Sequence, residues 1–393
     1  MKILIANLGS TSFKFRVFDM DTERLLARGG VDRIGSGGSR CVIKTAAVGE
    51  QQQLDAPDHA VALRHCIQQL ADPRMKCLSD PSDLAAIGFK AVHAQGITGV
   101  QRVDERVLAA MEAYNDVAPA HNPPYVKAMR LLAQQFPDLP LVAAFETGFH
   151  ETIPASRRTY AVPAEWQKLG VQRWGFHGAS HRYIAERTGK IFKNTQIRLI
   201  SCHLGGSSSI CAIRAGKSVA TSMGFSPQSG LPQNNRVGDF DPFALPVLMR
   251  ATGKSLEELL VDLAGYSGLE ALSGHRDLRD IETAMEKGDE QARLALEVFA
   301  NAVRQYIGAY LVVLGGADAI VFTGGIGENS ARMRAAICNN LDWFGIMVDP
   351  ALNDHAEGET RFDAMGSRVQ LWAMPTNEEL IVARQTRDFL KRS

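Results

Sequence analysis

Near the start of the chain, apolar and polar positions follow one another in a way that predicts a β-hairpin. The run Ile3–Ala6 is apolar, and Asn7–Ser12 contains the small and polar residues of a tight turn. Beyond this turn, Phe13, Phe15 and Val17 are separated by basic residues, as in a strand with one buried face.

A second segment of the same kind lies near the middle of the chain. The apolar run Ile197–Cys202 leads into the polar turn His203–Ser208, and Ser209–Ile213 resumes as a strand. Because each hairpin opens one half of the chain, the pair indicates an internal duplication.

Two longer segments have the periodicity of helices. Within Glu290–Leu314, apolar residues recur every three or four positions, and a buried strand is expected soon afterwards, at Ala319–Phe322. A C-terminal helix is expected to begin at Thr376, whose side chain would form a capping box with Glu379. Strands that alternate with helices predict an α/β protein.

Length, charge and cysteine content narrow the class of protein. A chain of 393 residues is expected to form two domains, since single cores stop growing near about 250–300 residues. The 43 basic and 43 acidic residues balance, so no overall field favours nucleic acid or a membrane surface as partner. No apolar stretch is long enough to span a membrane. The six cysteines lack metal-binding spacing and are expected to be reduced thiols of a cytoplasmic protein.

Three polar turns follow apolar strands and could bind phosphate. They are Asn7–Ser12, His203–Ser209 and Gly324–Asn329. Glycine lets the backbone approach an anion closely, and free amide groups at a turn attract negative charge. One such turn is usually ordinary turn chemistry, but three in one chain favour a phosphate-binding protein. The chain has neither the dinucleotide fingerprint nor the lysine motif of P-loop proteins.

Charged and imidazole side chains add candidate chemistry to these turns. His177 stands with a second histidine in a glycine-containing segment, and Ser180 is expected to cap a helix over Tyr183–Thr188. Arg236 lies in a predicted loop, where its guanidinium group suits phosphate or carboxylate. Glu378, at the start of the C-terminal helix, is either a metal ligand or a residue that complements the helix dipole.

In this order, these residues resemble those of the acetate and propionate kinases over essentially the whole chain. The matching segments are Asn7–Phe15, His121–Pro124, Phe145–Pro154, Gly175–Tyr183, Thr221–Phe225, Arg236–Pro242, Asp277–Asp280, Val321–Ser330 and Thr376–Arg384. The resemblance implies the fold of the acetate and sugar kinases, Hsp70 and actin: two ribonuclease-H-like domains with a nucleotide cleft between them. The expected domains are 1–150, onto which the helix 379–393 packs, and 151–378.

The resemblance also implies an activity and a set of site residues. We expect reversible, ATP-dependent phosphorylation of a short-chain carboxylate such as acetate by a homodimer that uses Mg²⁺ or Mn²⁺. Asn7 and Glu378 would hold the metal from opposite domains. The catalytic residues implied are Glu146, His177, Arg236 and His121. The acid would contact Lys90, Val92, Ala120, Phe176 and Pro227. The nucleotide would contact Lys14, His203, Leu204, Gly205, Gly206, Ser207, Ser208, Asp277, Leu278, Arg279, Gly324, Gly325, Ile326, Gly327 and Glu328.

Several positions inside the expected site depart from the family pattern. Lys90 stands where the family has a substrate-binding arginine, and Glu146 stands where it has an aspartate. The phosphate turn contains Gly206 and Ser207 in place of asparagine and glycine, and residues 232–235 differ as well. Because the sign of the charge is kept at positions 90 and 146, the departures indicate retuning of the site rather than loss of activity.

Two alternatives stay open. The acceptor could be a hydroxylated small acid, with Glu146 as the general base. The chain could also bind nucleotide without transferring phosphate and use domain closure as a switch. The presence of His177 and Arg236 argues against this second alternative, because binding alone does not require groups on the transfer side.

Overall fold

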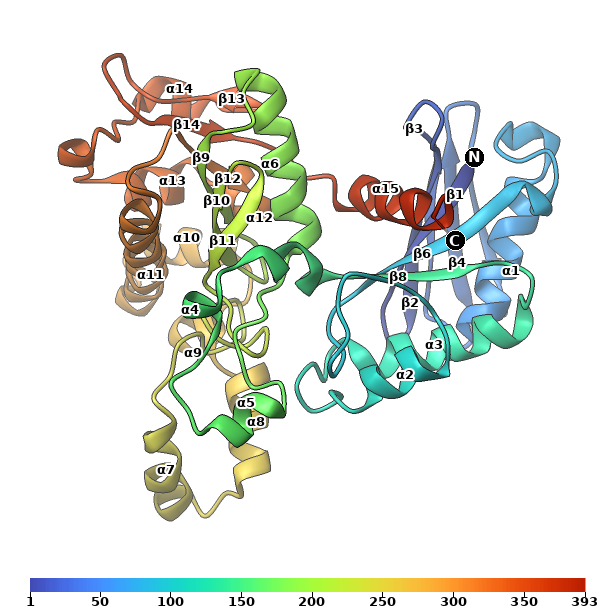
Figure 1. Ribbon diagram of the computed structural model, residues 1–393, viewed down its shortest axis with the longest axis horizontal. Coiled ribbons are helices and arrows are strands. Elements are labelled where there is room, and N and C mark those ends of the chain that lie inside the picture. The colour runs from blue at the N-terminus through green and yellow to red at the C-terminus, as the bar shows by residue number, and fades with distance from the viewer. Residues whose placement is uncertain (393) are drawn as a thin grey trace. The chain divides into compact units, whose positions relative to one another are not determined.

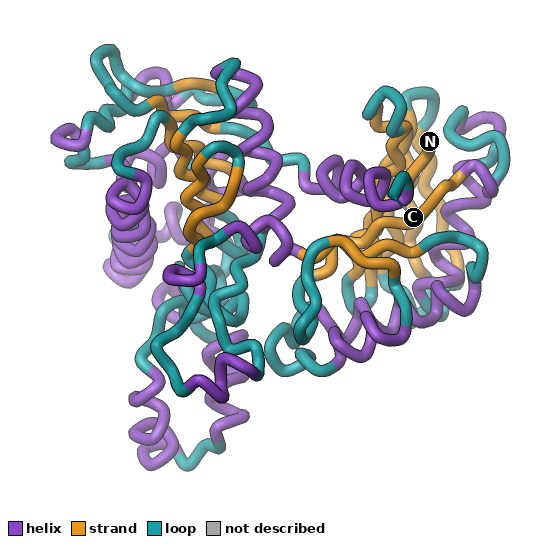
Figure 2. The backbone as a smooth tube through the Cα atoms, viewed as in Figure 1, coloured by secondary structure: helices purple, strands orange, loops and turns teal. Residues whose placement is uncertain are grey.

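The computed structural model describes residues 1–392 and contains two compact units (Figure 1). Met1–Gly148 and the segment from Asn377 onwards form the first unit, and Phe149–Thr376 forms the second. In each unit the strands form a central sheet and helices pack against it (Figure 2). The domain limits predicted from the sequence, 1–150 and 151–378, stay a prediction.

The first unit is built on an eight-stranded sheet with the strand order β5-β4-β3-β2-β1-β6-β8-β7. Its strands are β1 Lys2–Leu8, β2 Ser12–Asp19, β3 Arg24–Asp32, β4 Ser39–Thr45, β5 Gly49–Leu54, β6 Leu84–Ala91, β7 Val100–Arg102 and β8 Leu141–Phe145. The pairs β1/β6 and β6/β8 are parallel, and all other pairs are antiparallel. Since parallel strands end at the same edge, polar residues at the carboxyl ends of β1, β6 and β8 lie close together.

Helices cover both faces of this sheet. They are α1 His59–Leu70, α2 Glu105–Glu112, α3 Asn122–Gln135 and α15 Glu378–Leu390, with short 3-10 turns at Pro73–Met75 and Pro81–Asp83. Leu63 of α1 and Met129 of α3 share a core with Leu4 of β1. On the other face, α15 lies so close to β6 that an added Cβ at Gly88 would be 2.5 Å from Thr386 Oγ1. Glycine at this position permits the close approach of the helix.

The C-terminal helix starts differently from the sequence-based prediction. Asn377, not Thr376, is the N-cap, and its Oδ1 accepts a hydrogen bond from the Leu380 amide at 3.1 Å. Glu379 does not reach back to the cap, because its carboxylate lies 3.4 Å from the guanidinium group of Arg16. The predicted capping box is therefore wrong. A short asparagine side chain caps as well as threonine, and a tertiary ion pair holds the glutamate.

The second unit contains a six-stranded sheet with the order β11-β10-β9-β12-β14-β13. Its strands are β9 Arg198–His203, β10 Ser209–Arg214, β11 Lys217–Thr221, β12 Ala319–Thr323, β13 Thr360–Arg361 and β14 Gln370–Ala373. Its helices are α4 Ala155–Arg158, α5 Ala164–Lys168, α6 Gly178–Phe192, α7 Leu245–Thr252, α8 Leu256–Gly265, α9 Gly268–Ser273, α10 Leu278–Glu286, α11 Glu290–Leu314, α12 Gly324–Asn329, α13 Ala331–Cys338 and α14 Pro350–Asp354.

Two helices sandwich this second sheet. The predicted helix 290–314 is confirmed as α11, whose Phe299 and Ile307 share a core with Ile200 of β9. On the other side, Ile184 of α6 packs with Leu199 of the same strand. The start predicted for α6 is wrong: the helix begins at Gly178, so Ser180 lies inside it rather than at its cap.

The strand order supports the internal duplication inferred from the two hairpins. Both hairpins are present, because β1/β2 and β9/β10 pair antiparallel. In the first unit the order β3-β2-β1-β6-β8 has two antiparallel pairs followed by two parallel pairs. The order β11-β10-β9-β12-β14 in the second unit repeats these directions. Within residues 1–392, no helix is both long and apolar enough to span a bilayer.

Candidate active site

The first unit gathers polar side chains at the carboxyl ends of its parallel strands. Asn7 lies near the end of β1, Lys90 near the end of β6, and Glu146 directly after β8. The strand registers place Phe89 beside Ala6 and Lys90 beside Ala144, so the three side chains come to one edge of the sheet.

Lys90 is the only cation in this group. Its Nζ donates a hydrogen bond to Glu378 Oε2 at 2.6 Å, and the two side chains are 24% and 15% exposed. Burial alone would lower the pKa of Lys90, but the charges of Glu378 and Glu146 outweigh it and raise the pKa above its usual value. The ammonium group is therefore held protonated between two carboxylates.

Asn7 is oriented by a tyrosine that the sequence-based reasoning missed. The Tyr125 hydroxyl donates to Asn7 Oδ1 at 2.8 Å and accepts a hydrogen bond from the Leu8 amide at 3.2 Å. Burial raises the pKa of Tyr125, so this hydroxyl stays protonated and keeps its role as donor. The tyrosine follows the His121–Pro124 motif by one residue, which was the available signal.

The expected metal ligands lie within one unit. Asn7 belongs to β1, and Glu378 is the first residue of α15, which packs on β1, β6 and β8. The prediction that they come from opposite domains is therefore wrong, because the chain returns to the first sheet at Asn377. An amide oxygen and a carboxylate suit Mg²⁺. No group of three or more His, Cys, Asp and Glu side chains within residues 1–392 could hold a metal ion, so water and substrate oxygens would have to complete its coordination.

The second unit contains a cluster of histidines and serines around the start of α6. His177 has a left-handed backbone with φ of 55°, and its Nδ1 lies 2.8 Å from Ser209 Oγ. Its ring stacks on that of His203 with 4.2 Å between the ring centroids. The Ser209 hydroxyl also lies 2.9 Å from His181 Nε2, so one hydroxyl links two imidazole rings. Because a hydroxyl has a single proton, the tautomers of the two rings are coupled.

Two buried histidines, His150 and the His181 already named, support this cluster. His150 Nε2 donates to the Phe176 carbonyl at 2.9 Å, which leaves Nδ1 to accept from Ser218 at 2.9 Å. Burial lowers the pKa of His150 to about 4 and that of His181 well below its usual range. Both rings are therefore neutral near pH 7 and fix the segment that carries His177.

Arg236 is a cation without an acidic partner. Its Nη1 donates to Ser207 Oγ at 3.2 Å and to Gln233 Oε1 at 3.1 Å, and burial lowers its pKa. Gln233 is itself held by the Pro227 carbonyl, to which its Nε2 donates at 2.8 Å. Among the described residues 1–392, the partners of this guanidinium group are the neutral side chains of Ser207 and Gln233, and burial is the cause of its lowered pKa. A mostly buried, uncompensated arginine suits an anionic ligand.

A cavity of about 420 Å³ joins three of the segments expected to bind nucleotide. It is lined by Gly205, Gly206, Asn234, Asp277, Leu278, Arg279, Glu282, Gly325, Ile326, Asn329 and Ser330. Gly324, which precedes the lining residue Gly325, allows two turns to pack closely. Its φ is +77°, and an added Cβ would lie 2.6 Å from the Leu204 carbonyl oxygen. The expected nucleotide residues His203, Leu204, Ser207, Ser208, Gly324, Gly327 and Glu328 do not line this cavity, and Lys14 lies in the first unit.

The remaining expected residues fall into both units. In the first unit, His121 is the N-cap of α3, Ala120 before it is exposed, and Val92 follows β6. In the second unit, Phe176 and Pro227 are buried, and their carbonyl groups hold His150 and Gln233. That these residues contact a ligand stays a proposal.

Comparison with known proteins identifies the family. The model of the acetokinase family matches residues 2–384. The chain belongs to the acetokinase family. It is 42% identical to an acetate kinase from Moorella thermoacetica over 98% of both chains. A crystal structure of a propionate kinase from Francisella tularensis superimposes with a TM-score of 0.90 and 33% identity, covering 98% of this chain and 99% of that one. An acetate kinase from Porphyromonas gingivalis gives a TM-score of 0.88 and 33% identity over 99% of both chains.

Acetokinase-family membership confirms the expected fold class and enzyme class. The two α/β units with repeated strand order belong to the fold of the acetate and sugar kinases, as the sequence motifs indicated. The supporting residues Tyr125, Ser209 and Gln233 were not predicted. Tyr125 and Ser209 lie beside or within motifs that the sequence indicates, but only their contacts with Asn7 and His177 show their roles, and the role of Gln233 follows only from its contact with Arg236.

Proposed function

We propose that this chain is a carboxylate kinase that transfers the γ-phosphoryl group of ATP reversibly to acetate or a closely related short-chain acid. The observation that carries the proposal is the similarity to an acetate kinase along the whole chain, at 42% identity. The site adds support, because each unit contributes a cation at a place where an anion could bind, Lys90 in one and Arg236 in the other.

The reaction needs no general base. A carboxylate is ionised at neutral pH, so its oxygen can attack the γ-phosphorus directly. A new oxygen–phosphorus bond forms, the bond between the γ-phosphorus and its bridging oxygen breaks, and ADP leaves with the electron pair. The barrier lies in bringing two anions together and aligning them, so the protein has to supply positive charge and hydrogen-bond donors.

Arg236 and His177 would supply these groups in the second unit. Arg236 is held by Ser207 and Gln233 and keeps further N–H groups for phosphoryl oxygens. For His177, a consistent tautomer places the proton on Nε2, because Ser209 can donate to Nδ1 while accepting from His181. In the first unit, Glu146 and His121 are proposed as catalytic residues, and Lys90 would hold the acid with a single point charge.

The nucleotide is proposed to bind in the cavity of the second unit, with phosphates near the turn 204–208 and Lys14 as a further contact. Asn7 and Glu378 would hold Mg²⁺ or Mn²⁺, which when bound neutralises charge on the phosphates. We further propose the reducing cytoplasm as the compartment, because all six cysteines are unpaired and buried.

A trapping experiment tests the proposal. The enzyme is incubated with MgATP and either acetate, propionate, butyrate or a hydroxyacid, and the acyl phosphate is captured with hydroxylamine. We expect hydroxamate with acetate or propionate and ADP in equal amount. If none of the acids gives hydroxamate while ATP is consumed with a hydroxyl compound, the carboxylate assignment is wrong, and Glu146 becomes the candidate general base. If no acceptor supports ATP consumption, the chain binds nucleotide without transfer.

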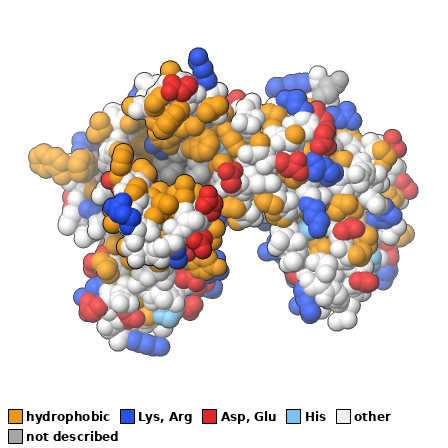
Figure 3. Space-filling model, turned by 90° about the horizontal axis from the view of Figure 1, so that it is seen from below, with side chains coloured by type: hydrophobic (Ala, Val, Ile, Leu, Met, Phe, Trp, Pro, Cys, Tyr) orange, Lys and Arg blue, Asp and Glu red, His pale blue; other side chains and the backbone are white. Residues whose placement is uncertain are grey.

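We also propose a homodimer formed through α7 and α8. Helix α7 buries none of its side chains, and α8 buries only Leu259. Exposed apolar residues on and around these helices include Phe243, Val247, Leu260, Val261 and Tyr266. Figure 3 shows hydrophobic side chains gathered on the drawn face of this unit. An apolar surface of this kind is typical of a permanent interface between subunits.

A further inference from the structure

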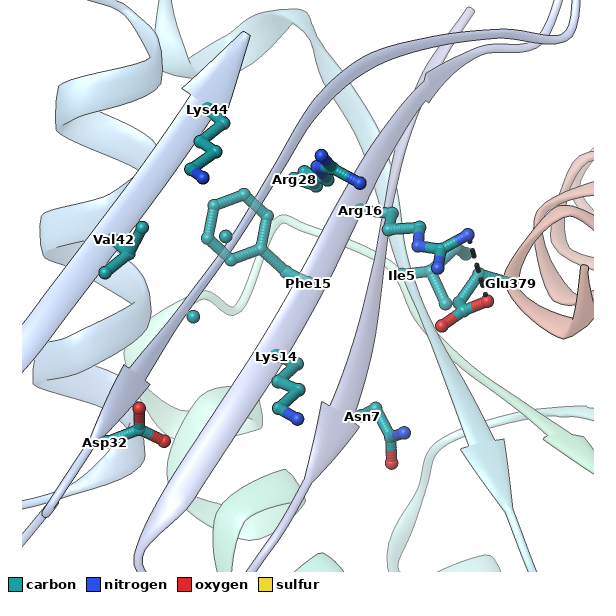
Figure 4. Close-up of a pocket in the computed structure, with 12 residues that line it drawn as sticks. Ile5, Asn7, Lys14, Phe15, Arg16, Arg28, Asp32, Val42, Lys44 and Glu379 are labelled. Carbon is teal, nitrogen blue, oxygen red and sulfur yellow. Dashed lines mark ion pairs between the residues drawn. The ribbon is translucent and has the colours of Figure 1, made fainter. Parts of the chain in front are cut away.

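The face of the first sheet that carries α15 also contains, on β2, β3 and β4, a row of cations that the proposed function does not use. Strand pairing places Arg16 directly opposite Arg28, and Arg28 directly opposite Lys44. Figure 4 shows the three side chains in a row across β2, β3 and β4. Lys14 lies on the same face, one pleat further along β2.

These cations have few acidic partners. Arg16 lies 3.4 Å from the Glu379 carboxylate, and within residues 1–392 no acidic side chain forms an ion pair with Arg28, Lys44 or Lys14. Like charges at directly opposite positions of a sheet destabilise it. An anion that binds between the three cations would offset their mutual repulsion and stabilise this part of the sheet.

The same face is hollowed into a cavity of about 370 Å³, lined by Ile5, Asn7, Lys14, Phe15, Arg16, Arg28, Gly29, Gly30, Asp32, Val42, Lys44 and Glu379. Gly30 has no side chain between Lys14 and Val42, the residues that flank it in the neighbouring strands, so the floor of the cavity is open there. The volume lies within the range of small-ligand sites. Asp32 and Glu379 stand at its margins, and the four cations leave an excess of positive charge.

We propose that this cavity binds a small molecule with two or three anionic groups, a polyphosphate or a polycarboxylate. Neighbouring strands are about 4.8 Å apart, so Arg16, Arg28 and Lys44 span about 10 Å, which matches a short chain of charged groups. A nucleic acid is not favoured, since the chain as a whole carries no net charge and the cavity is small. This cavity shares no lining residue with the cavity of the second unit that is expected to bind nucleotide. Asn7 and Lys14 also have roles in the proposed function, but Arg16, Arg28 and Lys44, on which the inference rests, have none.

Calorimetry with two probes tests this site. Inorganic tripolyphosphate and citrate are titrated at low ionic strength into the wild type, into Arg28→Gln/Lys44→Gln, and into the matched control Arg102→Gln/Lys76→Gln. The control removes two exposed cations from the same unit, so both double variants have the same net charge. We expect tripolyphosphate affinity to fall at least tenfold in the first variant and to stay within about twofold in the control. Binding of tripolyphosphate without citrate assigns the site to phosphates, and binding of both assigns it to polyanions generally.

Thermal unfolding gives an independent readout. Without ligand, Arg28→Gln/Lys44→Gln should melt at a higher temperature than the wild type, because the repulsion within the row is relieved. Tripolyphosphate should raise the melting temperature of the wild type by more than that of the variant. The single variants Arg28→Gln and Lys44→Gln are measured in the same way, so that one misfolded protein does not decide the result. Equal affinity of wild type and double variant, or no binding of either probe to the wild type, would overturn the proposal.

Discussion

The ammonium group of Lys90 lies between two acidic side chains, one from the end of β8 and one from the start of α15. A lysine provides a single charge with rotatable donors, whereas an arginine can hold a carboxylate with two parallel hydrogen bonds. The same residue therefore stabilises the first unit and determines how the proposed acid is held. At the residue scale, stability and chemistry are coupled at this position.

Replacing Lys90 should affect both the stability of the first unit and the kinetics with acetate. Lys90→Met removes the ion pair with Glu378 and should lower the free energy of unfolding by about 1–3 kcal/mol, since the pair is only partly exposed. It should also lower kcat/KM for acetate about 100-fold. Urea unfolding and steady-state kinetics measure both, with the exposed Lys76→Met as control. Unchanged kcat/KM in Lys90→Met would remove this residue from the acid site.

His150 should make stability depend on pH. Its pKa in the folded protein is about 4, whereas the ring in the unfolded chain protonates near its ordinary value of about 6.5. Between these values the unfolded chain binds more protons, so stability falls as the pH is lowered from 6.5 to 4, by about 3 kcal/mol. His150→Gln should flatten part of this slope in urea unfolding, with the rest due to His181. The exposed His275→Gln should leave it unchanged.

At the scale of elements, the turns after parallel strands decide where ligands can bind. The turn between β12 and α12 passes over the β9 turn, and the amides of Ile326 and Gly327 both donate to the Leu204 carbonyl. Gly324 makes this crossing possible, because its positive φ and missing side chain avoid that carbonyl. The nucleotide cavity thus depends on one glycine that does not line it.

Gly324→Ala should distort the nucleotide cavity, although residue 324 does not line it. The added Cβ would lie 2.6 Å from the Leu204 oxygen, so the turn has to shift, at a cost of roughly 1–3 kcal/mol. We expect ADP affinity to fall at least tenfold in calorimetry. Gly308→Ala is the matched control, because its Cβ meets nothing within 4 Å and alanine favours the helix. ADP affinity equal to the wild type in Gly324→Ala would show that the crossing tolerates a side chain.

At the scale of the whole molecule, two units repeat one strand order but differ in what surrounds their sheets. The first unit receives the C-terminal helix α15, and the second carries α7 and α8 on its surface. Helices with almost no buried residues gain little from their own unit, so an external contact is the simplest source of their stability. This argument supports the proposed dimer.

Charge placed in that surface should separate the subunits. Leu260→Glu/Val261→Glu puts two carboxylates on side chains that are 49% and 58% exposed, where an apolar interface could not accept them. Light scattering should show a dimer for the wild type and a monomer for this variant. Trp343→Glu changes a residue of the same unit that is 89% exposed and should leave the dimer intact. A wild-type monomer would contradict the proposal, and a variant that stays dimeric would assign the interface elsewhere.

The sequence by itself determined the elements whose causes are local. Apolar runs on either side of polar turns predicted the two hairpins, and the helical period over Glu290–Leu314 predicted α11 with its limits. The order of motifs along the chain was enough to indicate the acetokinase family, and with it the fold and class of reaction. These predictions succeeded because they depend on residues that are neighbours in the sequence and on the order of motifs, and both can be read without knowledge of tertiary contacts.

Only the tertiary structure decided which residues meet. Because the chain returns to the first sheet at Asn377, α15 begins there and Glu378 belongs to the first unit. The hydrogen bonds of Tyr125 and Ser209 join positions far apart in sequence, and the Arg16–Arg28–Lys44 row arises from strand register. A side chain's partners follow from distances in the folded chain, and spacing along the sequence does not contain them.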